Sequence, residues 1–118
     1  MNVSKIVILH NPRCSKSRAA LALLQERGIE PEVVDYLATP PSTHEIERIL
    51  GKLDLPPRAL MRRDEPDYAE LNLDDPSLSR AQLVAAMQEH PRLIQRPIVL
   101  ANGKAAIGRP PENVLSIL

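Results

Sequence analysis

The sequence is poor in aromatic side chains, with two tyrosines and neither tryptophan nor phenylalanine in 118 residues. A hydrophobic core must therefore consist mainly of Leu, Ile, Val and Ala. Proteins that bind single-stranded nucleic acid stack bases on aromatic side chains, which this chain can hardly provide. The fifteen basic residues balance fifteen acidic residues, so there is no net charge to attract nucleic acid or an anionic membrane. We expect neither as a partner.

Long hydrophobic runs and paired cysteines are also missing. The N-terminal segment Met1–His10 contains an apolar run of four residues, Ile6–Leu9, and no small-residue cleavage site follows it. Such a run is too short for a signal peptide or a membrane span. The single cysteine cannot form an internal disulfide. These observations predict a cytoplasmic location, where thiols are kept reduced.

Metal and nucleotide motifs are absent as well. One cysteine and three scattered histidines (His10, His44 and His90) do not have the spacing of metal ligands. Four glycines form no glycine-rich nucleotide loop. We therefore expect no metal and no bound cofactor.

The first third of the chain predicts a β–α–β unit within a single domain that spans residues 1–118. Lys5–Leu9 and Pro31–Leu37 are rich in residues typical of strands. Between them, Ser15–Arg27 has a helical pattern, and Gly28 stands where a helix commonly ends. A crossover helix of this kind makes the two strands parallel.

The middle of the chain is predicted to be helical. Ser42 or Thr43 can cap a helix that runs to about Lys52. The stretch Leu55–Leu73 is divided into short helical pieces by three prolines, and Ser79 can cap a helix from Arg80 to about His90.

The last part predicts a hairpin and a helix. Ile98–Ala101 and Lys104–Gly108 flank Asn102–Gly103, a strong hairpin-turn signal, and Glu112–Leu118 follows as a helix. The whole order predicts an α/β, thioredoxin-like fold. It would have a mixed four-stranded sheet with flanking helices and a helical insertion in the middle.

Cys14 is the residue most indicative of chemistry, because it lies between the first strand and the first helix. A helix N-terminus favours an anion, and thiols placed there can have a pKa of roughly 3.5–7.5 instead of about 8.5. Arg13, Lys16, Arg18 and His10 lie close in sequence and can add positive charge. A lone cysteine can also be merely a small buried hydrophobe. Its place at this junction favours a reactive thiolate.

Two known cysteine motifs do not fit. A Cys-x-x-Cys dithiol needs cysteine at position 17, where Ser17 stands. A phosphatase-type loop needs arginine at position 20, where Ala20 stands. An external thiol such as glutathione must therefore resolve oxidised Cys14.

Several blocks of sequence resemble the glutaredoxin-linked arsenate reductases in order and approximate spacing, and together they cover almost the entire chain. These blocks are His10–Arg18, Ala59–Arg62, Leu93–Val99 and Gly108–Pro110. One departure is that Ser15 and Lys16 follow the cysteine, where well-established members have Gly and Thr.

The resemblance implies that Cys14 attacks arsenate and forms a covalent cysteine–arsenic adduct. Glutathione would be the co-substrate and glutaredoxin the partner protein, with arsenite as the product. Arg62, Arg96 and Arg109 match the arginines that hold the oxyanion, and Arg96-Pro97 matches a cis-proline position. His10 either tunes the pKa of Cys14 or is a satisfied residue at a strand end. The remaining supporting residues are Asn11, Ser15, Ser17 and Arg18.

Fixed positive charge suits this reaction, because arsenate and a thiolate are both anions. Arginine outnumbers lysine by eleven to four, and its planar fork can bind two oxygens at once. Two alternatives stay open: a glutathione-dependent thiol reductase acting on another substrate, and a redox-sensing regulator of the same fold that binds a protein partner. Such regulators typically use a Cys-x-x-Cys switch, which Ser17 does not permit.

Overall fold

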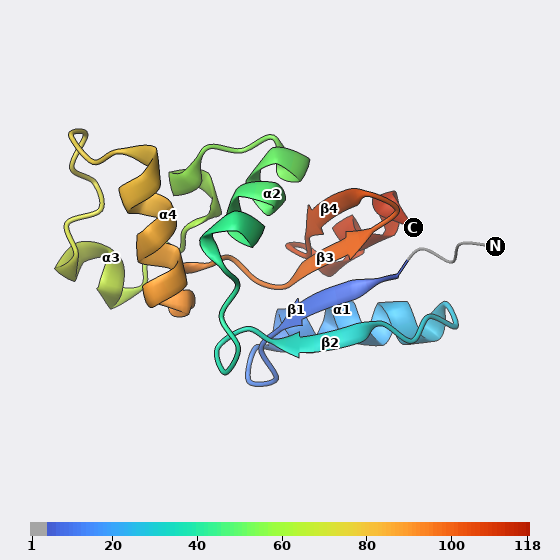
Figure 1. Cartoon of the computed structure of the whole chain (residues 1–118). Coiled ribbons are helices and arrows are strands. Elements are labelled where there is room, and N and C mark those ends of the chain that lie inside the picture. Colours follow the sequence, from blue (N-terminus) through green and yellow to red (C-terminus); the bar gives the residue numbers. More distant parts are fainter. Residues whose placement is uncertain (1–4) are drawn as a thin grey trace. The chain divides into compact units, whose positions relative to one another are not determined.

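The computed structural model describes residues 5–118, so the first part of the predicted N-terminal segment, residues 1–4, lies outside the described residues. The chain divides into two compact units (Figure 1). One unit runs to Thr39 and resumes with Arg96–Leu118, and the other is Pro40–Gln95. The assignment of residues 1–118 to a single domain stays a prediction.

The first unit contains a four-stranded sheet in the order β2-β1-β3-β4. Its strands are β1 (Val7–His10), β2 (Glu32–Asp35), β3 (Ile98–Ala101) and β4 (Lys104–Ile107). β1 and β2 are parallel, whereas β1–β3 and β3–β4 are antiparallel. The predicted mixed sheet of the thioredoxin-like fold is confirmed.

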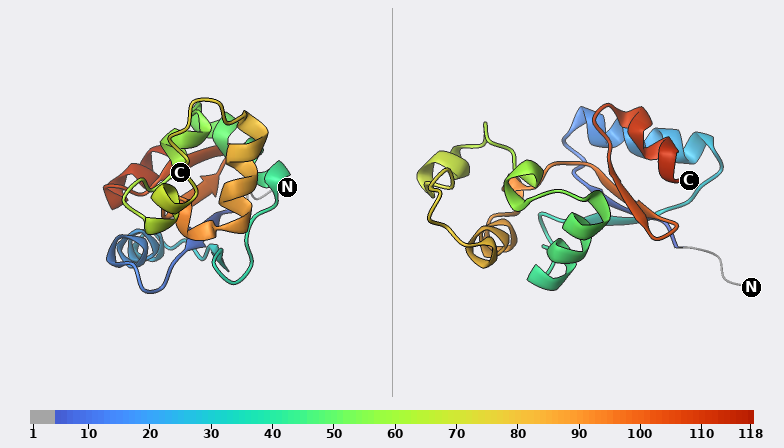
Figure 2. Two further views of the ribbon diagram at one scale, coloured as in Figure 1. Left: turned by 90° about the vertical axis from the view of Figure 1, so that its left-hand side faces the viewer. Right: turned by 90° about the horizontal axis from the view of Figure 1, so that it is seen from above.

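Helix α1 (Ser15–Glu26) connects β1 to β2, as its sequence pattern predicts. Gly28 follows it with φ of 74°, a conformation that costs glycine little. The chain ends in the 3₁₀ helix η3 (Pro111–Ile117), where the sequence predicts a helix over Glu112–Leu118. Figure 2 shows α1 and η3 on the same face of the sheet. The two helices and the sheet share one apolar core, which consists of Ile8, Ala20, Leu24, Val99, Ala101, Ala106, Val114 and Ile117.

The hairpin between β3 and β4 has the turn that its sequence predicts. Asn102 and Gly103 have φ of 54° and 74°. Positive φ at both central residues is what a type I′ turn requires, and this turn matches the twist of the two strands.

The second unit consists of short helices, as predicted. They are α2 (Thr43–Leu53), η1 (Pro57–Leu60), α3 (Pro66–Glu70), α4 (Arg80–Glu89) and η2 (Pro91–Leu93). Ser42, rather than Thr43, caps α2 in a reciprocal capping box with Glu45, and Ser79 caps α4 in the same way with Gln82. Among residues 5–118, no helix has the length and apolarity needed to cross a membrane.

Candidate active site

Cys14 occupies the N-cap position of α1, directly after the turn that follows β1. Its backbone is extended, and its N–H donates to the carbonyl oxygen of Asn11 at 3.0 Å. The carbonyl oxygen of Cys14 accepts the N–H of Arg18 at 3.0 Å. The first turn of α1 contains no acidic residue. The predicted strand-to-helix junction therefore places the thiol at the positive end of a helix, without a carboxylate in the same turn.

The surroundings of Cys14 stabilise its thiolate. Burial by itself would raise the pKa of the thiol. The backbone N–H groups of Ser17 and Lys16, the charge of Arg96 and a hydrogen bond from Arg109 act in the opposite direction and prevail. The pKa of Cys14 is lowered from its ordinary value, so a larger fraction of the thiol is the nucleophilic thiolate at neutral pH.

Arg96 and Arg109 come from the two ends of the β3–β4 hairpin. Each precedes a proline through a cis peptide bond; the bond at Arg96-Pro97 was predicted from the family resemblance, and the one at Arg109-Pro110 was not. The Nε–H of Arg109 donates to the backbone carbonyl oxygen of Arg96 at 3.0 Å. This bond holds the Arg109 side chain against the backbone of Arg96, at the open end of the hairpin where β3 begins and β4 ends.

The guanidinium of Arg96 has unused donors. Its Nε and Nη1 atoms are buried and have no hydrogen-bond partner among the described residues. Buried, unpaired donors are costly, and donors of a charged guanidinium bind an oxyanion strongly. Arg96 is therefore suited to an anionic ligand beside the thiolate whose pKa it lowers.

Gly108 permits a close backbone approach next to these arginines, a role that the sequence pattern did not reveal. Its N–H donates to the carbonyl oxygen of Pro97 at 2.8 Å. A Cβ atom at this position would lie 2.7 Å from the Cγ atom of Pro97, closer than side chains normally come. The signal in the sequence is a glycine directly before Arg109, outside any turn.

His10 and Ser17 form a buried polar pair at the base of α1. The Nδ1 atom of His10 lies 2.6 Å from the Oγ atom of Ser17, which also accepts the backbone N–H of Asn11 at 3.0 Å. The pKa of His10 is lowered by burial, which Asp35 opposes and Arg18 reinforces. A neutral imidazole at neutral pH follows. The pair joins the end of β1 to the turn of α1 that provides N–H groups to Cys14.

The other predicted supporting residues order the loop before α1. The side-chain oxygen of Asn11 accepts the backbone N–H of Arg13 at 3.0 Å, and Arg18 donates to the carbonyl oxygen of Pro12 at 3.0 Å. Ser15 is exposed in the first turn of α1. Asn11 and Arg18 thus hold the backbone on either side of the cysteine.

Arg62 belongs to the Pro40–Gln95 unit. Its side chain is mostly buried and pairs with Glu65 at 2.9 Å and, more loosely, with Asp64 at 3.7 Å. Its backbone N–H donates to the carbonyl oxygen of Leu93 at 2.6 Å. Arg62 is thus a fixed arginine with carboxylate partners of its own.

Metal ligation has no support in the described part of the chain. Within residues 5–118, no three His, Cys, Asp or Glu side chains are grouped so that they could hold a metal ion.

Comparison with known proteins identifies the family. Residues 9–117 match the ArsC family. An arsenate reductase of Neisseria meningitidis is 56% identical over 115 residues, which cover 97% of this chain and 98% of the relative. An arsenate reductase of Escherichia coli is 41% identical over 116 residues, covering 98% of this chain and 82% of the relative.

Solved structures agree with the sequence comparison. The structure of an arsenate reductase from Vibrio cholerae superposes with a TM-score of 0.96 at 56% identity, covering 99% of this chain and all of that one. This chain belongs to the ArsC family.

Proposed function

We propose that this chain reduces arsenate to arsenite at Cys14. The Cys14 thiolate attacks arsenic, and one oxygen of arsenate leaves as water after protonation, which forms a covalent cysteine–arsenic adduct. Glutathione then attacks the adduct. The two sulfur atoms supply two electrons, arsenic(V) becomes arsenic(III) and leaves as arsenite, and a mixed disulfide joins Cys14 to glutathione. Glutaredoxin reduces that disulfide and returns Cys14 as a thiol.

The observation that carries the proposal is the joint effect of Arg96 and Arg109 on Cys14. One arginine contributes its charge and the other a hydrogen bond, and both lower the pKa of the thiol. Arg96 keeps two buried donors unpaired among the residues described. An oxyanion that reacts with the thiolate needs such fixed positive charge, because two anions otherwise repel each other.

Arginine is the appropriate residue for this task. Its planar fork binds two oxygens of one anion, and each charge-assisted bond contributes about 1.5–3 kcal/mol. Arg62 is the third arginine that the family resemblance assigns to the oxyanion. Its guanidinium contacts one carboxylate oxygen of Glu65 at 2.9 Å within its own unit.

The need for external thiols follows from the sequence around Cys14. Cys14 is the only cysteine of the sequence, and position 17 is a buried serine. Cys14 therefore has no second thiol in the chain with which to form a disulfide. Glutathione and glutaredoxin are therefore proposed as the reductants. A reaction that consumes reduced glutathione suits the reducing cytoplasm, which we propose as the location.

The decisive experiment is a coupled assay of NADPH oxidation with glutathione, glutathione reductase and glutaredoxin. Arsenate is added to the wild-type chain and to the Cys14→Ser variant. We expect arsenate-dependent turnover for the wild type and none for the variant. Omitting glutaredoxin should abolish most of the turnover if it is the physiological reductant.

Arg96→Ala tests the oxyanion assignment in the same assay. Loss of about 1.5–3 kcal/mol of interaction predicts a fall in kcat/KM of about ten- to one-hundred-fold. Arg92→Ala, an exposed arginine in η2, is the matched control and should keep wild-type activity. Unchanged turnover of Arg96→Ala would show that Arg96 does not hold the oxyanion. A folded wild-type chain with a reactive Cys14 but no turnover would contradict arsenate as the substrate.

A further inference from the structure

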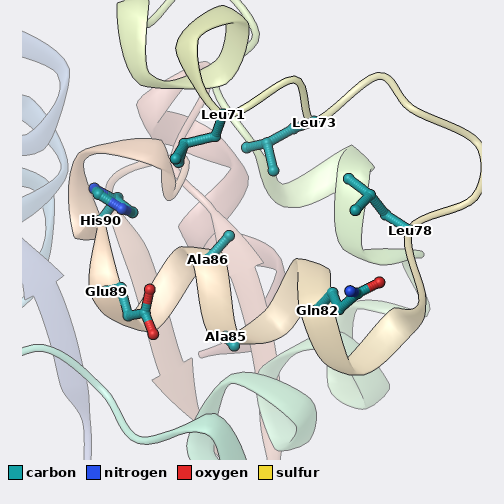
Figure 3. A pocket seen from close by; sticks show the side chains of 8 residues that line it. All are labelled: Leu71, Leu73, Leu78, Gln82, Ala85, Ala86, Glu89 and His90. Carbon is teal, nitrogen blue, oxygen red and sulfur yellow. The ribbon is translucent and has the colours of Figure 1, made fainter.

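A groove lies in the Pro40–Gln95 unit, between α4 and the connection that precedes it. Its volume is about 240 Å³. Figure 3 shows leucine side chains of the connection on one side, among them Leu71 and Leu73, and Ala86 of α4 facing them. Glu89 and His90 line the groove at the C-terminal end of α4. None of the residues that line the groove belongs to the unit that contains Cys14.

The connection that forms one wall is held by specific hydrogen bonds. Arg58 donates from Nε to the carbonyl oxygen of Leu73 at 2.9 Å and from Nη2 to that of Asp75 at 2.6 Å. The hydroxyl of Tyr68 donates to the carboxylate of Asp74 at 2.6 Å. A wall fixed in this way exists before any partner binds, which lowers the entropic cost of binding.

Leu71 makes the rim of the groove apolar. Its side chain is 38% exposed, and it is one of four large hydrophobic residues that the described chain leaves exposed. Leu73 is buried in the wall beneath it. An exposed leucine beside an apolar hollow offers surface that another apolar side chain can cover.

The charge around the groove is negative. Residues 66–79 contain Asp67, Glu70 and two further aspartates, but neither lysine nor arginine. Glu70 and Glu89 are exposed and have no ion-pair partner in the part of the chain that is described. Asp67 faces His90 at 3.6 Å, a pair that is ionic only when the histidine is protonated.

The neighbouring arginines offset only part of this charge. Arg58 donates to two backbone carbonyl oxygens, and its positive charge adds to the hydrogen bonds from Ser77 that lower the pKa of Asp75. Arg80, the first residue of α4, forms a two-pronged pair with Glu47, the shortest contact being 2.7 Å. Glu89, which lines the groove, and the nearby Glu70 are therefore the carboxylates available to a cationic partner.

We propose that this groove docks a basic, amphipathic helix of a partner protein, with an apolar side chain in the hollow and lysines or arginines against the rim. Several observations select this occupant. A second copy would oppose acidic rim to acidic rim. Nucleic acid would be repelled. The hollow is smaller than the roughly 300–1,000 Å³ of typical small-molecule sites. This interaction is separate from the proposed reaction at Cys14.

The test is an NMR titration of the full, ¹⁵N-labelled chain with two synthetic helical peptides. Both carry leucine at positions i and i+4, and one has lysine and the other glutamate at the remaining surface positions. We expect the basic peptide to shift the amide signals of Leu71, Ala85, Ala86 and Glu89. A higher salt concentration should lower the affinity of this peptide. Absence of these shifts, or equal shifts with the acidic peptide, would overturn the proposal.

Two variants sharpen the test. Leu71→Ser removes the apolar side chain at the rim and should lower the affinity for the basic peptide at least about five-fold. Leu37→Ser is the matched control, because Leu37 is 36% exposed but lies in the other unit. This variant should bind the basic peptide with wild-type affinity. Equal losses in both variants would contradict docking at the groove.

The rim charges are tested by Glu70→Gln together with Glu89→Gln. Exposed ion pairs contribute about 0.2–1 kcal/mol each, so the double variant should bind the basic peptide up to about thirty-fold more weakly. Unchanged affinity would remove charge as the basis of recognition. A dimer of the chain in sedimentation velocity that Leu71→Ser dissociates would replace the proposed partner by a second copy.

Discussion

The Nε–H of Arg109 donates to the backbone carbonyl oxygen of Arg96 at 3.0 Å. One edge of the Arg109 guanidinium is thus anchored to backbone, and the same side chain hydrogen-bonds the thiol of Cys14. A side chain that is held at one edge loses less entropy when its other donors bind. The two arginines therefore act on the thiol as a connected pair.

Arg109→Lys tests this connection. Lysine keeps the positive charge but has no Nε–H edge, so it cannot donate to Arg96 and to the thiol in the same geometry. We expect the apparent pKa of Cys14 to rise towards the ordinary value of about 8.5. The measurement is the rate of alkylation by iodoacetamide as a function of pH.

The control for that experiment is Arg92→Lys, which changes an exposed arginine outside the site in the same chemical way. Its alkylation profile should coincide with that of the wild type. If Arg109→Lys also leaves the profile in place, charge alone accounts for the effect of Arg109, and the anchoring bond to Arg96 has no role.

The lowered pKa of Cys14 also predicts how stability depends on pH. The folded chain releases the thiol proton at a lower pH than the unfolded chain, so the thiolate favours the folded state. This contribution is complete above the unfolded thiol pKa of about 8.5 and is lost as the pH falls through the lower, folded pKa. The wild type should therefore gain stability relative to Cys14→Ser as the pH rises.

Urea unfolding of both proteins at acidic, neutral and alkaline pH measures this difference, because the other titrating groups are common to both and cancel. A difference that stays constant across this range would show that the thiol has the same pKa in the folded and unfolded chains.

Local signals made most of the fold predictable. The β1–α1–β2 unit, the helix caps at Ser42 and Ser79 and the Asn102-Gly103 turn each depend on a few neighbouring residues, and all appear in the structure. The cis bond at Arg109-Pro110 and the 3₁₀ form of η3 were not predicted. Val114 and Ile117 of η3 pack in one apolar cluster with Ala20 and Leu24 of α1, which lie far away in sequence, and a local sequence pattern does not contain such packing.

The site was predictable only in part, for a similar reason. The position of Cys14 at a helix N-terminus follows from its neighbours in sequence. The convergence of Arg96 and Arg109 depends on the pairing of β3 with β4, and their identity as candidates came from the family resemblance. The close approach of Gly108 to Pro97 needs coordinates, because a glycine outside a turn has many explanations.

Ser17→Ala tests the buried pair with His10. The substitution removes the hydroxyl that lies 2.6 Å from Nδ1 of His10 and accepts the N–H of Asn11. Because it leaves buried polar groups unpaired, it should lower the free energy of unfolding by about 1–3 kcal/mol. Ser15→Ala, an exposed serine in the same turn, should change it by less than about 0.5 kcal/mol. Urea unfolding followed by circular dichroism compares the two, and equal effects would deny the pair a structural role.

Asn102 has two separable roles in the hairpin, and two substitutions distinguish them. Its side-chain amide donates to the carbonyl oxygen of Ile117 at 2.8 Å, and its backbone has φ of 54°. Asn102→Gly removes the hydrogen bond but tolerates the positive φ, so it should cost about 0.5–1.5 kcal/mol. Asn102→Ala loses the bond and must also adopt the left-handed conformation, which adds about 1–2 kcal/mol.

The free energies of unfolding of both variants are measured by urea titration, with Lys104→Ala as an exposed control in the same hairpin. The expected order of stability is wild type, then Asn102→Gly, then Asn102→Ala. If glycine and alanine cost the same, the hydrogen bond to Ile117 accounts for the whole effect. If glycine costs nothing, the asparagine is there for its backbone conformation, and the bond to η3 contributes little to the packing of the C-terminal helix.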